Sequence, residues 1–404
     1  MTRRPVILAF CLIFFAVNVW GLYTFVTSKI GIANDFFQRW YGVRAFVLEG
    51  RDPYSPQISR EVEQLVFGGP PSHDIALAQY PGDFVYPFPF ALVIAPLVFF
   101  PYEVASALWI GLTGAAIVIS FVLMADLFRW RLAPWLLIVA IVWVLTFYPA
   151  SRGIFLGQPG TMVVCLELIA LWALNRRLDL LAGIALGIST YKPQLGLLLL
   201  PALGLWALRF GRWHFVVSLI VTTLLMYGVS LVLLPAWPGE WWAQVSSYNG
   251  YTEIGAPVAI ITGTYLPFLG RPGEILLTVA LVGLVAWAWA TLLWRRDMRY
   301  FNWTVALTLT VTHITLLRTA TPHYVVFLVV LVFTFRELYR TGGPIPVLVS
   351  MAILTFGLWA LFFMTLYVRF ESPLMYLPLP LLALLLLLFM RNNWAENAPA
   401  GTGP

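Results

Sequence analysis

Charged residues are scarce in this sequence, because Asp, Glu, Lys and Arg together make up only 10% of its 404 residues. A soluble globular protein has roughly a quarter of its residues charged. Hydrophobic residues make up 61%, enough for many membrane spans of ~20 apolar residues each. The composition excludes a soluble enzyme and a disordered chain, and it predicts an all-α polytopic membrane protein with one integral membrane domain over residues 1–404.

Cysteine and lysine are equally rare. Cys11 and Cys165 each lie in an apolar run, so the sequence indicates neither a disulfide nor a metal site. Of the 24 basic residues 22 are arginine, which leaves only Lys29 and Lys192 as lysines. In a membrane protein positive charge mainly marks the cytoplasmic side. The net charge of +6 therefore indicates membrane orientation rather than nucleic-acid binding.

Thirteen apolar runs are candidate membrane spans. They lie near residues 6–27, 84–101, 102–127, 132–149, 160–174, 180–191, 194–208, 213–234, 274–294, 300–317, 323–335, 344–367 and 373–390. If the proline-rich run 84–101 enters the membrane without crossing it, the other twelve place 14 arginines on short cytoplasmic segments and four on short external ones. This distribution predicts about twelve transmembrane helices in the plasma membrane, both termini cytoplasmic, and a short cytoplasmic tail at 391–404.

Two long segments, 28–83 and 235–272, are external in this topology. The first carries four apolar residues at helical spacing, Phe36, Trp40, Val43 and Val47. They predict an amphipathic juxtamembrane helix that lies on the membrane surface. The second carries Trp241 and Trp242, whose rings could stack on a sugar, although tryptophan also gathers at membrane interfaces.

Ionisable groups beside apolar runs are the candidates for chemistry, because burying them is costly. Asp35 follows the first run and could act as a general base on a substrate hydroxyl, although Asp35 and Gln38 also fit a helix capping box. Lys192 lies between two apolar runs where Pro193 interrupts a helix. It could bind a phosphate, or it could extend to the membrane surface from a helix end.

Two further groups lie at the external ends of spans. Arg318 and His323 belong to one short link and could bind a phosphate or carboxylate, although a plain turn explains them equally well. His313 lies inside a span, as a histidine that hydrogen-bonds between helices would. Arg152 and Gln158 precede a span beside two glycines, a pattern that turn chemistry also explains. Apart from His313, the candidates all fall on the external face in one topology, which indicates a site there.

The order of the motifs resembles that of a known family. It runs from Asn34-Asp35 at the exit of the first span through GRDPY, YPFPFALVIAPL, GQ before a middle span, AGIALGISTYKP and a late PHY. This order is similar to that of the polyprenyl-phosphate-mannose-dependent transferases of glycosyltransferase family 87, which have the GT-C fold. The resemblance covers most of residues 30–335.

The resemblance implies a membrane transferase that moves a sugar, usually mannose, from a polyprenyl-phosphate donor to a glycolipid or glycan acceptor on the external face. It implies a single inverting displacement without a cofactor. Asp35 matches the family's expected general base, and Lys192 and His323 match groups expected near the donor phosphate, with Arg318 as a further candidate. Tyr86, Gln158, Arg152, Trp241 and Trp242 are possible substrate-binding residues.

The sequence departs from the family pattern in two places. The usual paired prolines after Tyr86 read Pro87-Phe88-Pro89, and the segment 235–272 lacks the expected Asn-Gln-Ser pattern, which leaves the acceptor open. Asp83 and Glu253 leave a metal requirement open as well.

Two other functional classes remain open from sequence. A transporter or flippase of a lipid-linked sugar would hold its polar groups near the bilayer midplane, reachable from both sides. In a structural membrane subunit, Asp35 and Lys192 would be dispensable. A transferase instead needs Asp35, Lys192 and His323 to line one external cavity.

Overall fold

The computed structural model describes residues 3–69, 81–251, 255–315, 319–366 and 371–396, and all regular elements in these ranges are helices. Five helical segments are long and apolar enough to cross a membrane: α5 (Tyr102–Leu127), α11 (Trp213–Leu233), α14 (Gly270–Arg295), α17 (Pro344–Thr365), and the segment Thr321–Gly342 made of η6 (Thr321–Phe327) and α16 (Leu328–Gly342). A sixth span forms if α6 (Pro134–Thr146) and α7 (Tyr148–Leu156), which meet at an angle of 57°, are counted together. The all-α polytopic architecture is confirmed.

The long helices differ in how much of their surface other helices cover. Only 17% of the apolar window of α11 and of α17 is buried, against 83% for the segment formed by η6 and α16. Large apolar side chains such as Val232 and Met364 are more than four-fifths exposed. A soluble protein rarely exposes apolar surface on this scale. The outer faces of α11, α14 and α17 are therefore the lipid-facing surface.

Helix α15 (Phe301–Thr315) occupies the centre of the bundle. Every side chain from Phe301 to Ile314 is buried, including those of four threonines and His313. It packs against α14, η6 and α18 (Pro378–Phe389). A helix that is buried on all sides positions the elements around it, and η6 carries one of the predicted site residues.

The predicted number of twelve membrane spans is not settled by the structure, because several of the apolar helices are short. Each of the twelve runs contains a helix, including α1 (Arg3–Leu22) with η1 (Tyr23–Thr27), α8 (Pro159–Asn175), α9 (Asp179–Ser189) and α10 (Leu199–Arg209). However, α9 and α10 have 11 residues each, which corresponds to ~16 Å, about half of the ~30 Å hydrocarbon layer. The proline-rich run 84–101 forms two shorter helices, α4 (Pro89–Ile94) and η3 (Ala95–Phe99), which are also too short to cross as one helix.

Helix α9 packs closely and in parallel on α11 through two glycines four residues apart. A Cβ atom on Gly187 would lie 2.6 Å from Thr222 Cβ, and one on Gly183 would clash with Ser218 and with the Phe215 carbonyl. Small residues at this spacing let two membrane helices approach closely. Beyond the contact, the Tyr227 hydroxyl donates to the Thr190 carbonyl at 2.8 Å, which holds the turn that follows α9.

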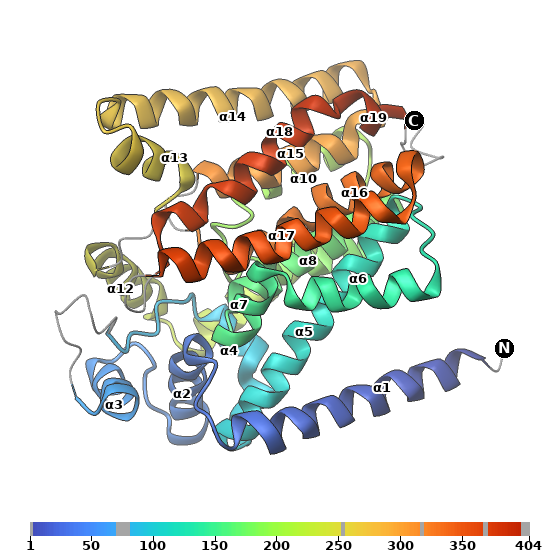
Figure 1. Cartoon of the computed structure of the whole chain (residues 1–404). Coiled ribbons are helices and arrows are strands. Elements are labelled where there is room, and N and C mark those ends of the chain that lie inside the picture. The colour runs from blue at the N-terminus through green and yellow to red at the C-terminus, as the bar shows by residue number, and fades with distance from the viewer. Residues whose placement is uncertain (1–2, 70–80, 252–254, 316–318, 367–370, 397–404) are drawn as a thin grey trace.

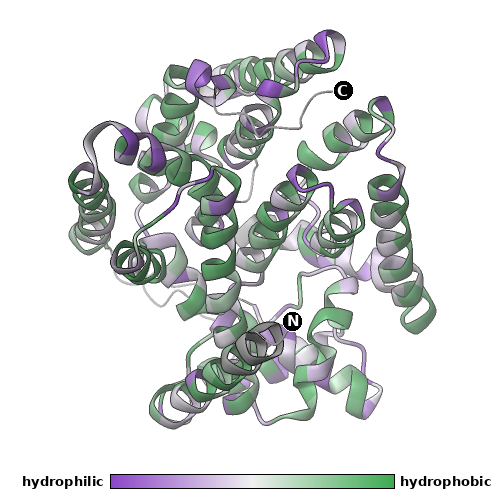
Figure 2. Ribbon diagram, turned by 90° about the vertical axis from the view of Figure 1, so that its right-hand side faces the viewer, coloured by the Kyte–Doolittle hydropathy of each residue, from purple (hydrophilic) through white to green (hydrophobic). Residues whose placement is uncertain are grey.

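The connections outside the spans divide the molecule into two ends (Figure 1). The first, here called the α2 end, carries α2 (Asn34–Glu49), α3 (Pro56–Phe67), α12 (Trp237–Tyr251) and α13 (Pro257–Ile260) with η4 (Ile261–Tyr265). The second, here called the termini end, is where α1 begins and where α19 (Arg391–Glu396) lies. Figure 2 shows the molecule from the termini end, coloured by hydropathy. Hydrophilic residues lie mainly at the helix ends and in the connections.

A helix, α2, occupies the predicted position in the first loop, and its place on the membrane surface stays a prediction. Helix α2 ends at Gly50, whose φ of +67° places it in the left-handed region that glycine tolerates. Phe36, Trp40 and Val43 are buried, whereas Val47 near the end of the helix is 39% exposed. In Figure 1, α2 runs crosswise to the long helices, as a helix on a membrane surface would.

Candidate active site

Five polar side chains from five different segments form one chain of close polar contacts near the α2 end: Asp35, Gln158, Tyr86, Lys192 and His323. Gln158 Nε2 donates to Asp35 Oδ2 at 2.7 Å, and the Tyr86 hydroxyl donates to Gln158 Oε1 at 2.9 Å. Lys192 Nζ then donates to the Tyr86 oxygen at 2.9 Å and lies 3.1 Å from His323 Nε2. The structure thus brings Asp35, Lys192 and His323 together, with Tyr86 and Gln158 between them.

Asp35 lies in the first turn of α2 and points at Gln158 rather than capping its own helix. The N-cap residue is Ala33, and no side chain caps α2. Ala33 has a left-handed φ of +64°, and its N–H donates to the Phe155 carbonyl at 3.0 Å, which joins the start of α2 to α7. The interpretation of Asp35 as a capping-box residue is therefore wrong, because its carboxylate faces the network.

The surroundings of Asp35 strengthen it as a base. Burial raises the pKa of Asp35 above its ordinary value, while the cations of Arg39 and Lys192 partly offset this effect. Among the described residues no donor bonds to Oδ1, and the side chain keeps partial exposure. A carboxylate with raised proton affinity and one open oxygen can accept a proton from a hydroxyl.

Gln158 is held by the sharp turn between α7 and α8. Gly157 ends α7 with a φ of +62°, and a Cβ atom there would lie 2.6 Å from Ala33 Cβ. Gln158 is the N-cap residue of α8, and Trp109 Nε1 donates to the Gly157 carbonyl at 2.8 Å. Gly157 is thus required both by the turn and by the close approach of α2.

Lys192 lies in the turn between α9 and α10 and is only 9% exposed. Its ammonium also lies 5.1 Å from the centre of the Tyr86 ring, a cation–π contact. No carboxylate among the described residues forms an ion pair with it. The lysine does not extend to the surface from a helix end, since its charged group is enclosed by polar and aromatic side chains.

His323 presents its outer nitrogen to Lys192. The Ala320 backbone N–H donates to His323 Nδ1 at 3.1 Å, so a neutral imidazole carries its proton on Nε2. With this tautomer the Nε2–H and the ammonium are two donors 3.1 Å apart, so their contact is not a hydrogen bond, and an oxygen that accepts from both would stabilise it. A Cβ atom on Gly160 would clash with the His323 ring and would lie 2.8 Å from Lys192 Nζ, so only glycine leaves this space open.

His313 is near the network without belonging to it. Its ring centre lies 6.4 Å from that of His323, and its Nδ1 lies 2.9 Å from the Leu309 carbonyl of its own helix. Nδ1 therefore bonds within α15, and not to another helix as the sequence had predicted for His313.

Arg152 forms an ion pair beside the network. Its Nε lies 2.9 Å from Glu371 Oε1, and the Glu371 carboxylate also accepts from the Thr321 hydroxyl at 2.8 Å and the Tyr376 hydroxyl at 3.1 Å. The Tyr148 hydroxyl donates to the same carboxylate. This cluster secures the start of η6, two residues before His323. Arg318, the other arginine predicted here, lies outside the described residues.

The aromatic residues of α12 do not join the network in the described part of the chain. Trp241 contacts Trp242 and Trp237 at ring-centre distances of 6.3 and 6.2 Å, and Trp242 is 65% exposed. Their helix is tied to the network's neighbourhood through Gln244, which accepts from the Val85 N–H at 3.0 Å.

Arg39 is the residue that the sequence analysis missed. It lies one turn after Asp35 in α2 and is 8% exposed, with its guanidinium 4.9 Å from the centre of the Tyr86 ring. Its Nη1 donates to the Asp35 backbone carbonyl at 2.9 Å and to Gln38 Oε1 at 2.6 Å. Its Nε is buried without a partner in the described structure. The i, i+4 spacing puts Arg39 on the same face of α2 as Asp35, but every helix contains such pairs, so this spacing alone does not mark a site residue.

The described residues contain no group of three or more His, Cys, Asp or Glu side chains that could hold a metal ion. Of the two carboxylates that left the question open, Asp83 accepts from the Ser59 hydroxyl at 2.8 Å and Glu253 lies outside the described residues. The arrangement as described is a carboxylate connected by neutral hydrogen-bonding groups to a lysine, a histidine and an arginine.

Comparison with known proteins places this arrangement in a family. The family model for glycosyltransferase family 87 matches residues 84–319, more than half of the chain. The matched region contains Tyr86, Gln158 and Lys192. No curated protein and no solved structure matches the chain. The chain therefore belongs to glycosyltransferase family 87 and is a membrane glycosyltransferase.

Proposed function

We propose that this glycosyltransferase moves mannose from a polyprenyl-phosphate donor to a hydroxyl of a lipid-linked or cell-envelope acceptor. The observation that carries the proposal is the buried network with a carboxylate at one end and cations at the other. In the proposed GT-C-type reaction, one displacement inverts the anomeric carbon, and no cofactor takes part in binding the substrates.

Asp35 acts on the acceptor in this proposal. The acceptor oxygen forms a bond to the anomeric carbon, the acceptor proton passes to Asp35, and the bond from the anomeric carbon to the phosphate oxygen breaks. Gln158 holds Oδ2 at 2.7 Å, so the open Oδ1 is the oxygen that receives the proton. General-base assistance of this kind contributes typically ~10²–10⁴-fold in rate.

Lys192, His323 and Arg39 act on the donor. The leaving polyprenyl phosphate gains negative charge in the transition state, and fixed donors in an enclosed site stabilise such charge. Lys192 Nζ and His323 Nε2 lie 3.1 Å apart, close enough that one phosphate oxygen could accept hydrogen bonds from both. Arg39 brings a planar guanidinium from the side of Asp35, and no carboxylate among the described residues forms an ion pair with it.

The orientation in the membrane is part of the proposal. The start of α1 and the whole of α19 lie at the end opposite the network (Figure 1). Ion pairs at that end join arginines predicted to be cytoplasmic to neighbouring acids, Arg176 to Asp126 and Arg212 to Asp179. The positive-inside rule supports cytoplasmic termini and an external active site, and we place the protein in the plasma membrane.

A flippase of lipid-linked sugars was the alternative from another class. Family membership makes the chain an enzyme, and the network gathers near one end of the bundle rather than in a path open to both ends. No observation on the described residues favours transport over transfer.

The test is sugar transfer in membranes that contain the full-length protein. Membranes receive radiolabelled polyprenyl-phosphate mannose or, in a parallel sample, a labelled nucleotide sugar, and the glycolipids are then separated. We expect labelled glycolipid only from the polyprenyl donor and none from Asp35→Asn. Labelling from the nucleotide sugar alone would overturn the donor, and full activity of Asp35→Asn would overturn the base.

A further inference from the structure

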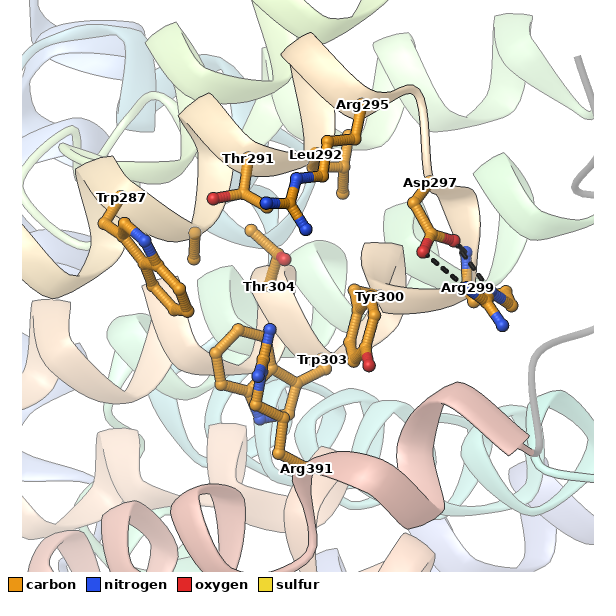
Figure 3. A pocket seen from close by; sticks show the side chains of 11 residues that line it. Trp287, Thr291, Leu292, Arg295, Asp297, Arg299, Tyr300, Trp303, Thr304 and Arg391 are labelled. Carbon is orange, nitrogen blue, oxygen red and sulfur yellow. Dashed lines mark hydrogen bonds and ion pairs between the residues drawn. The ribbon is translucent and has the colours of Figure 1, made fainter.

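A second polar cavity lies at the termini end, far along the bundle from the network. It has a volume of about 260 Å³ and is enclosed by the end of α14, by η5 (Met298–Tyr300) with the start of α15, and by α19 (Figure 3). None of the residues that line it is part of the candidate active site. Its function is therefore a separate question.

The cavity carries an excess of positive charge. Three arginines line it, Arg295, Arg299 and Arg391, against one carboxylate, Asp297. Asp297 is already engaged, because Arg299 Nε and Nη2 donate to its oxygens at 2.9 and 2.8 Å. Among the described residues, no carboxylate pairs with Arg295 or Arg391. These two guanidinium groups can therefore bind an anion from outside the protein.

Arg391 is held in place by aromatic rings rather than by an acid. Its guanidinium lies 5.1 Å from the Trp287 ring centre, 4.7 Å from that of Tyr300 and 5.1 Å from that of Trp303. These cation–π contacts fix the plane of the group. Figure 3 shows Arg391 rising from α19 and Arg295 descending from α14 toward the same space. The Nε of Arg391 is buried without a partner in the described structure.

A buried hydroxyl also lacks a partner here. Thr304 of α15 lines the cavity and is fully buried, and its Oγ1 makes no hydrogen bond with any described residue. Leaving a buried hydroxyl unpaired is costly, so such a group indicates a ligand or an ordered water. The hydroxyl and the two arginines together offer donors to one oxygen-rich anion.

We propose that this cavity binds the phosphate of an anionic phospholipid from the membrane leaflet at the termini end. The cavity lies at the depth expected of a lipid head group, because α14 and α16 end there and α19 begins there. The outer face of α14 continues from the mouth with exposed apolar side chains, among them Leu276, Val279 and Trp287. The acyl chains of a lipid held by its phosphate would lie along this face. Basic pockets between membrane helices on the cytoplasmic side bind acidic lipid head groups in the same way.

The experiment measures lipid binding by the purified full-length protein in detergent, by native mass spectrometry. Phosphatidylglycerol is compared with phosphatidylcholine of the same acyl chains and with sn-glycerol 3-phosphate, which carries the phosphate without a lipid. We expect tight retention of phosphatidylglycerol only. Equal binding of phosphatidylcholine would overturn the anion site, and equally tight binding of glycerol 3-phosphate would overturn the lipid assignment.

Two variants and a control locate the binding. Arg295→Gln removes the charge of an exposed side chain, so it tests the site with little effect on the fold, and we expect about fivefold weaker phosphatidylglycerol binding. Arg391→Lys keeps the charge but loses the stacked plane, and we expect a weakening of similar direction. Arg131→Gln removes an exposed arginine elsewhere at the same end and should leave binding unchanged. Wild-type affinity in Arg295→Gln, or a loss equal to it in Arg131→Gln, would overturn the proposal.

Discussion

The two ends of the molecule hold a positively charged side chain in different ways. At the α2 end, Lys192 is held by hydrogen bonds to Tyr86 and lies against His323, residues 106 and 131 positions away in the sequence. At the termini end, Arg391 is held by three aromatic rings, and the other charged groups of its cavity all lie between Arg295 and Arg299. Hydrogen bonds between distant segments give one end a defined geometry suited to chemistry. Stacking and local charge at the other end suit the binding of a lipid phosphate, as proposed above.

The largest expected effect is the loss of sugar transfer when the carboxylate at the α2 end is removed. Asp35→Asn keeps the shape and the bond to Gln158 but removes the proton acceptor, so we expect sugar transfer to fall by roughly 10²–10⁴-fold. The matched control is Asp126→Asn, an exposed acid of the termini end that pairs with Arg176. Transfer rates at saturating donor, with thermal denaturation as a check on folding, decide the comparison. Similar losses in both variants would show that the effect is not specific to the site.

The next largest effect concerns the donor phosphate. Lys192→Met removes the ammonium while keeping a long apolar stem, and we expect a loss of roughly 10²-fold in kcat/KM, because one fixed donor to a transition-state charge is worth about this much. Lys29→Met, at the exit of the first helix, should change little. Transfer is measured over a range of polyprenyl-phosphate mannose concentrations. An unchanged response to the donor would return Lys192 to a structural role.

A third effect concerns stability rather than chemistry. Glu371→Gln removes the buried carboxylate that Arg152 and Thr321 share, and its side chain is only 6% exposed. Breaking a buried ion pair costs ~3–5 kcal/mol, so the free energy of unfolding should fall by an amount of this order. Asp297→Asn, which breaks an exposed ion pair at the termini end, serves as the comparison and should not change the melting temperature. Equal melting temperatures for wild type and Glu371→Gln would contradict the structural role of this cluster.

The smallest effect is a shift in the pH profile. Because burial raises the pKa of Asp35, its carboxylate takes up a proton at higher pH than an exposed aspartate does. The base is lost as the pH falls through this raised pKa, so kcat/KM should begin to fall on the acid side earlier than an ordinary aspartate would allow. Binding of phosphatidylglycerol at the arginine cavity should stay constant over the same range, since arginine keeps its charge. An acid limb that is the same in Asp35→Glu as in wild type would argue against this assignment.

The sequence allowed the helical architecture to be predicted, because apolar runs and helical spacing are local properties. Motif order pointed to Asp35, Lys192 and His323, and the structure brings them into one network. Arg39 could not be placed, since its spacing from Asp35 is common to every helix and only the position of Tyr86 makes it part of the site.

Residues paired across long distances were also beyond the sequence. Arg152 was a candidate for substrate binding, but its partner Glu371 lies 219 positions further along the chain. From sequence, Arg391 indicated only the cytoplasmic side of the membrane. The rings that hold it belong to α14, η5 and α15, which lie far from it in the sequence. The number of membrane spans stays a prediction for a related reason: hydropathy locates apolar runs, but their length in space depends on where each helix breaks.

The short helices α9 and α10 have a consequence for how the protein enters its membrane. Each extends ~16 Å, so neither satisfies the thickness of the lipid layer by itself, and the turn between them carries the buried Lys192. The close contact of α9 with α11 at Gly183 and Gly187 can form only after α11 has been synthesised, so the position of α9 and of the turn that follows it depends on a later segment of the chain. Lys192 therefore reaches its place in the network only after translation has passed α11.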